Sequence, residues 1–163
     1  MHSGGDDVKI VGQVVVRRPV DVVFDFFADM VRLPEYAPED FVSVTRDTPE
    51  PIGLSSRFTF VMKRARAKST FEWETFERPR RLVWSGPRLA IGPGWVEFWG
   101  EYMFETVEGG TQVRARFRPT LGGANRFFAP AIKIRNTLVL GRQLRRVRDL
   151  IERQAWAATA LHD

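Results

Sequence analysis

Residues 125–153 read NRFFAPAIKIRNTLVLGRQLRRVRDLIER, and this stretch decides the fold that we predict. At about 3.6 residues per turn, its apolar side chains gather on one face and most of its arginines on the others, which predicts one long amphipathic helix. Asn136 and Gln143, about two turns apart, fall near the middle of the apolar face. A buried amide needs hydrogen-bond partners, either from the backbone, which is the common case, or from water or a ligand in a cavity.

The composition is that of a single globular domain. With 163 residues, of which 44% are hydrophobic, the chain can bury roughly 70% of the surface that it exposes when unfolded. We expect one ligand-binding domain over residues 8–157, with flexible tails at 1–7 and 158–163. No apolar run reaches about 18 residues and the first residues are polar and acidic, so we expect neither a membrane span nor a secretion signal, and a cytoplasmic protein.

The scarce residue types exclude several kinds of chemistry. The chain has no cysteine, and its two histidines, His2 and His162, lie at its ends. Thiolate catalysis, a Ser-His-Asp triad and most transition-metal sites are therefore excluded. We expect no metal and no cofactor, so any reaction would depend on carboxylates, tyrosines, arginines, amides or ordered water.

The net positive charge of the chain favours binding to nucleic acid, but the distribution of that charge argues against it. The formal net charge is +5 and the sequence pI is about 10.2, and clustered basic residues bind phosphates. Here the arginines are spread over the expected outer faces and interleaved with acidic residues. Nucleic acid is thus not the expected partner, although a basic protein that contacts RNA or another partner stays as an alternative, and the oligomeric state is left open.

Ahead of the long helix, the hydrophobic period changes from that of helices to that of strands. A strand is predicted over residues 8–17, a helix from Pro19, and a short helix or turn over 33–38. Alternation with a period of two then predicts six strands between residues 41 and 119, interrupted by a Gly- and Pro-rich loop at 85–94. This order predicts an α+β fold in which a curved seven-stranded antiparallel sheet wraps around the long C-terminal helix.

The space between that sheet and the long helix is the predicted ligand site. The alternation turns aromatic side chains toward the helix, where they form either an ordinary core or the wall of a cavity for a flat apolar ligand. The residues predicted to line the cavity are Phe58, Phe60, Met62, Phe71, Trp73, Trp84, Phe98, Tyr102, Phe104, Asn136, Val139, Leu140 and Gln143.

The acidic residues of the strands are predicted to lie on the opposite face. By the same alternation they should point outward into water, which argues against a pair of catalytic carboxylates. These residues are Glu72, Glu74, Glu97 and Glu101.

Several short segments, taken in their order and spacing, resemble a known family. They are PVDVVFDFFAD at 19–29, LPEY at 33–36, ERPRRLVW at 77–84 and GGTQV at 109–113. Over about residues 8–153 the chain resembles the polyketide cyclase/dehydrase branch of the START-like (SRPBCC, helix-grip) superfamily. The resemblance implies a helix-grip fold with a cavity for a hydrophobic molecule such as a lipid, a quinone or a polyketide.

The resemblance also implies a choice between two functions. In cyclases of the aromatase type a pocket holds a reactive poly-β-ketone while a Tyr, Arg or acid assists proton transfer and loss of water. Tyr36, at the expected entrance, and Tyr102 are the candidate catalytic residues, whereas Arg57 and Glu35 are expected to face solvent. The alternative is a non-enzymatic carrier of a lipid or quinone.

Overall fold

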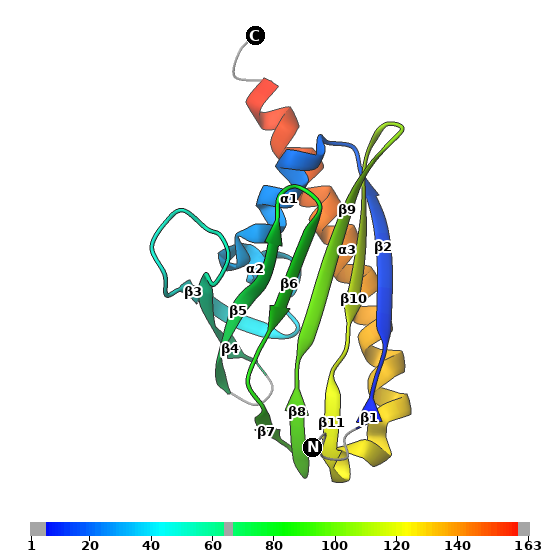
Figure 1. Cartoon of the computed structure of the whole chain (residues 1–163). Coiled ribbons are helices and arrows are strands. Elements are labelled where there is room, and N and C mark those ends of the chain that lie inside the picture. The colour runs from blue at the N-terminus through cyan, green and yellow to red at the C-terminus, as the bar shows by residue number, and fades with distance from the viewer. Residues whose placement is uncertain (1–5, 64–66, 160–163) are drawn as a thin grey trace.

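The computed structural model describes residues 6–63 and 67–159, which leaves the outermost residues of both predicted tails, with His2 and His162, outside the described residues. A seven-stranded antiparallel sheet curves around one long helix, α3 (Ala129–Thr159), as Figure 1 shows. Along the sheet the strand order is β2, β10, β9, β6, β5, β4, β3. The strands are β2 (Ile10–Val16), β3 (Phe41–Arg46), β4 (Arg57–Met62), β5 (Lys68–Glu77), β6 (Arg81–Ser85), β9 (Trp99–Val107) and β10 (Gly110–Phe117). The predicted fold class is confirmed.

Three short helical segments follow β2, where the sequence predicted a helix and then a short second helix or turn. They are α1 (Val20–Ala28), the 3-10 helix η1 (Met30–Arg32) and α2 (Leu33–Tyr36). Asp29 ends α1, and its side chain accepts a hydrogen bond from the Val31 backbone, which starts η1. The single turn of α2 stops at Tyr36 because Ala37 precedes a proline, which disfavours helical geometry at that alanine.

A second, smaller sheet was not predicted. Its strand order is β1, β11, β8, β7. Its strands are β1 (Asp6–Asp7), β7 (Leu89–Ile91), β8 (Gly94–Glu97) and β11 (Thr120–Gly123), and the 3-10 helix η2 (Ala124–Phe128) leads from β11 into α3. Residues 6–7, expected in a flexible tail, therefore pair with β11, and the expected loop at 85–94 contains strand β7.

The core lies between the large sheet and the helices. Val147, Leu144 and Ile151 of α3 are buried against the sheet, and α3 comes so close to β2 that a Cβ on Gly12 would lie 3.0 Å from a methyl group of Leu144. On the other side of the core, Phe24 and Phe27 of α1 pack edge-on against Phe104 of β9. The α1 helix thus fills one end of the groove that the sheet forms.

Glu101 departs from the prediction that strand carboxylates point into water. It lies on the outer face of β9, as the alternation predicts, but it is only 4% exposed. Arg81 Nε and Arg116 Nη2, from the two neighbouring strands, bind its carboxylate at 2.8 and 2.9 Å. Strand alternation gives the face of a side chain, whereas the covering arginines decide its exposure.

Candidate functional site: an aromatic cavity

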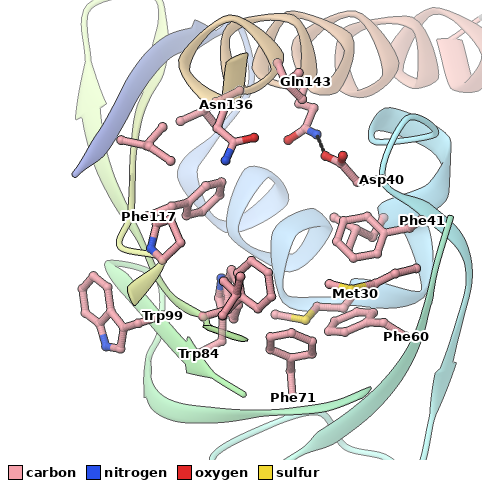
Figure 2. Close-up of a pocket in the computed structure, with 18 of the residues that line it drawn as sticks. Met30, Asp40, Phe41, Phe60, Phe71, Trp84, Trp99, Phe117, Asn136 and Gln143 are labelled. Carbon is pink, nitrogen blue, oxygen red and sulfur yellow. Dashed lines mark hydrogen bonds between the residues drawn. The ribbon is translucent and has the colours of Figure 1, made fainter. Parts of the chain in front are cut away.

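The part of the groove that α1 leaves open is a cavity of about 280 Å³. The large sheet, the smaller sheet, α3 and the segment from α1 to β3 all contribute to its wall. Aromatic rings in contact follow one another along the sheet side, with centroids 4.5 Å apart for Phe60 and Phe71, 5.0 Å for Phe71 and Trp84, and 5.8 Å for Trp84 and Phe117. Figure 2 shows this aromatic wall opposite the amides of α3.

Most of the residues predicted for the site lie in the wall of this cavity. The predicted residues that line it are Tyr36, Phe60, Met62, Phe71, Trp84, Phe98, Tyr102, Asn136, Val139, Leu140 and Gln143. For the strand and α3 residues, strand parity and helix periodicity gave the inward face because the groove follows these regular elements. Tyr36 belongs to neither pattern.

Three predicted residues lie in the core instead of the cavity wall. Phe58 is fully buried, and the Trp73 indole nitrogen donates to the Ala28 carbonyl at 3.3 Å. Phe104 packs against α1. All three face inward as predicted. The α1 helix closes the space in front of Trp73 and Phe104, and Phe58 is buried within the core.

Other lining residues were missed by the sequence reasoning. Met30, Leu33 and Phe27 come from the helical segments, whose placement no local pattern gives. Phe117 continues the inward series of β10 and could have been found by its parity. Trp99 could not, since a break in the strand at Phe98, between β8 and β9, lets two consecutive aromatic residues line the cavity.

The two tyrosines predicted to be catalytic come together inside the cavity. Tyr36, expected near the entrance, is only 3% exposed, because the turn of α2 directs it inward. Its ring and that of Tyr102 lie against Phe27, with centroids 6.3 and 4.8 Å away. Burial, and then the nearby Tyr102, raises the pKa of Tyr36 well above its usual value, and burial raises the pKa of Tyr102 as well. Both side chains are therefore neutral phenols.

A third polar group lies beside these phenols. The indole nitrogen of Trp84, which approaches the Tyr102 hydroxyl, is buried without a hydrogen bond of ordinary geometry to any described residue. A buried N–H of this kind is costly unless an acceptor reaches it. The Tyr102 oxygen is the nearest such acceptor, and an oxygen of a bound molecule would be another.

The amides of α3 are held by charged side chains and not by the backbone. The Asn136 side-chain oxygen accepts from Arg135 Nη1 at 2.8 Å, and Arg135 Nη2 donates to Asp40 at 3.1 Å. Gln143 Nε2 donates to the other oxygen of Asp40 at 3.0 Å (Figure 2). All four residues line the cavity, so they form a polar edge to an otherwise apolar wall.

The other candidates lie outside the cavity lining. Glu35 pairs with Arg32 at 3.0 Å on the surface, and Arg57 is exposed, as expected. Over residues 6–63 and 67–159, no cluster of three or more His, Cys, Asp or Glu side chains is suited to a metal ion. None of the helices in the same residues is long and apolar enough to span a membrane.

A curved antiparallel sheet that grips a C-terminal helix and leaves an aromatic cavity between them defines a protein of the helix-grip class. Within it, the chain belongs to the family described as polyketide cyclase/dehydrase and lipid transport, whose model matches residues 7–152. No curated protein matches the chain in sequence.

Solved structures share the fold at low sequence identity. The Zhui aromatase/cyclase from Streptomyces sp. R1128 is 20% identical with a TM-score of 0.68, over 94% of this chain and 98% of that one. The di-domain ARO/CYC protein StfQ of the steffimycin pathway is 13% identical with a TM-score of 0.72, over 91% of this chain, which spans only 52% of StfQ. Truncated norcoclaurine synthase from Thalictrum flavum is 10% identical with a TM-score of 0.66, over 93% of this chain and 97% of that one.

Proposed function

We propose that the protein binds a flat, mostly apolar molecule with oxygen substituents, of the polyketide type, and promotes its cyclisation and loss of water. The observation that carries the proposal is the convergence of two neutral phenols, Tyr36 and Tyr102, in an aromatic cavity. The family description and the aromatase/cyclase relatives support the same class of ligand.

The size and lining of the cavity favour a compact ring system as the ligand. Its volume of about 280 Å³ is at the lower end of ligand pockets, which span roughly 300–1,000 Å³. Aromatic walls bind flat rings by stacking and edge contacts. A lipid with two acyl chains fits this space poorly. If the protein is a carrier and not an enzyme, we therefore expect its ligand to be a small quinone or a similar molecule.

The phenols would act as hydrogen-bond donors to carbonyl oxygens. A phenol that donates to a ketone oxygen makes the carbonyl carbon more electrophilic. An enol carbon of the same poly-β-ketone molecule can then form the new carbon–carbon bond with it. The ketone oxygen becomes a hydroxyl with the proton that the enol oxygen gives up. This hydroxyl then leaves as water together with a proton from the neighbouring carbon. Because burial disfavours phenolate, the tyrosines stay neutral throughout.

The test is the replacement of each phenol by phenyl. Tyr36→Phe and Tyr102→Phe should each lower the turnover of a reactive poly-β-ketone roughly tenfold or more. Anthraquinone binding, followed by tryptophan fluorescence, should weaken by no more than the roughly three- to tenfold that one lost hydrogen bond costs, since the stacking surface of the ring stays in place.

The outcomes distinguish an enzyme from a carrier and from a protein that binds no such ligand. Unchanged turnover in both variants would remove the tyrosines from the reaction. Wild-type protein that binds anthraquinone but never converts a poly-β-ketone would be a carrier, and wild-type protein that binds neither would end the cavity proposal.

A further inference from the structure

In the polar edge of the cavity, Asn136 and Gln143 each use only one of their two amide groups, the C=O or the NH2, in a hydrogen bond. Asn136 engages its oxygen with Arg135, and Gln143 engages its nitrogen with Asp40. Figure 2 shows the remaining atoms, the Asn136 nitrogen and the Gln143 oxygen, directed toward the cavity. Among residues 6–63 and 67–159, no hydrogen-bond partner reaches either atom, so the first is a donor and the second an acceptor that a ligand can engage.

Two charged side chains, Asp40 and Arg135, fix the orientation of the two amides. The Asp40 carboxylate can only accept, so it requires the nitrogen of Gln143 on its side and directs the oxygen inward. The Arg135 guanidinium can only donate, so it requires the oxygen of Asn136 and directs the nitrogen inward. Arg135 also donates to Asp40, which joins the two pairs into one network.

We infer that Asn136 and Gln143 form a directional recognition subsite, which binds a hydrogen-bond acceptor of the ligand at Asn136 and a donor at Gln143. This inference rests on the proposed function and specifies its substrate class. The ligand is a hydroxylated aromatic ketone or quinone, with a carbonyl oxygen at Asn136 and a hydroxyl at Gln143. The two residues are separated by about two helical turns, on the order of 10 Å along the axis, so the two groups lie on different rings of the ligand.

The subsite also sets the direction in which the ligand lies. Tyr36, Tyr102 and the Trp84 indole can all donate, so they favour carbonyl oxygens. Gln143, by contrast, presents an acceptor oxygen to the cavity while Asp40 holds its nitrogen. A ligand turned end for end would place a carbonyl oxygen against the Gln143 oxygen, which is repulsive.

Two probes separate donor from acceptor recognition. Anthraquinone carries two carbonyl acceptors and no donor, whereas anthraflavic acid adds two phenolic donors on its outer rings. Binding would be measured by tryptophan fluorescence at a pH where these phenols are neutral. The wild-type protein should bind anthraflavic acid roughly three- to tenfold more tightly than anthraquinone, the effect of one additional hydrogen bond.

Two variants test the two halves of the subsite. Asn136→Asp keeps an oxygen that accepts from Arg135 and replaces the inward N–H donors by a carboxylate oxygen, which repels a carbonyl oxygen, so it should weaken both probes at least roughly threefold. Gln143→Met has a similar length and no such acceptor. It should lower the affinity for anthraflavic acid to that for anthraquinone and leave anthraquinone unchanged. Gln112→Glu on the outer face of β10 makes the same charge change as Asn136→Asp away from the cavity and should change neither affinity.

The inference and the proposed function fail in different ways. If the wild-type protein binds neither probe, the proposed ligand class is wrong. If it binds both, and Asn136→Asp leaves the anthraquinone affinity unchanged or Gln143→Met lowers both affinities equally, the directional subsite is overturned while the cavity proposal stands. Thermal unfolding of each variant shows that the comparison is made on folded protein.

Discussion

At the scale of single residues, Tyr36 and Tyr102 are set apart by their burial. They are 3% and 6% exposed, and burial raises the pKa of each. A phenol that is neutral at every physiological pH can donate a hydrogen bond to a ketone but cannot serve as a base. The environment of these residues therefore restricts the chemistry that the sequence left open.

The raised pKa values predict that the protein loses stability in alkaline solution. Above about pH 10 the unfolded chain releases the two phenolic protons while the folded chain retains them, so the folded state binds more protons and stability falls as pH rises. The slope should be up to about 1.4 kcal/mol per pH unit for each tyrosine. Urea unfolding at a series of pH values measures it. Tyr102→Phe should give a shallower slope, and an equal slope would contradict the prediction.

Glu101 is the residue for which sequence and structure differ most clearly. Glu101→Gln should lower the free energy of unfolding by about 1–2 kcal/mol, because it weakens two charge-assisted hydrogen bonds to arginines that are themselves 41% and 42% exposed. Glu105→Gln is the matched control, since Glu105 is 65% exposed and lies 3.5 Å from Arg114. Urea unfolding of both variants should show the larger loss for Glu101→Gln, and equal losses would contradict the role of burial.

At the scale of elements, the pairing of β6 with β9 positions the Trp84 indole in the cavity wall. Trp84 lies directly across from Gly100, and its indole covers the glycine so closely that a Cβ there would overlap with the ring. The missing side chain of Gly100 thus leaves the space that the indole occupies against β9, where it lines the cavity. The hydrophobic pattern of the sequence cannot predict the position of the indole, because that position depends on Gly100, which only the strand pairing places opposite Trp84.

Gly100→Ala should therefore disturb both packing and binding. Displacement of the indole should lower the free energy of unfolding by about 1–3 kcal/mol, the usual range for overpacking, and should also weaken anthraquinone binding. Gly53→Ala is the control, because a Cβ there meets nothing within 4 Å; it should be neutral or slightly stabilising. Chemical denaturation and fluorescence titration of the two variants make the comparison, and equal behaviour would show that the indole has room to move.

At the scale of the whole molecule, the cavity exists because one helix cannot fill the full length of a curved sheet. The α1 helix closes one end, over Phe104 and Trp73, and the open remainder is lined from the sheets, from α3 and from the segment between α1 and β3. Ligand binding and packing compete for this space. A larger side chain in the wall should abolish binding without unfolding the protein.

Val139→Phe tests this competition. Val139 lines the cavity and is 7% exposed, so a phenyl ring there should occupy ligand space and weaken anthraquinone binding more than about tenfold. The melting temperature should stay within about 4 °C of the wild-type value, since the ring enters existing space. Leu138→Phe makes the same kind of change at the next residue, which is 59% exposed on the outer side of α3, and should leave binding intact. Retained binding in Val139→Phe would place the ligand elsewhere.

The sequence by itself determined the order of the strands of the large sheet, the face to which most of their residues turn and the long C-terminal helix with its two amides. It did so because periodicity along the chain is a local property that residues such as Phe60, Phe71 and Gln143 carry in their spacing. Only the tertiary structure decided where the cavity begins and ends, that Tyr36 lies inside it, that the strand breaks at Phe98, and that Asp40 and Arg135 orient the amides. These features depend on which distant segments meet, and no local pattern in a single sequence specifies such contacts.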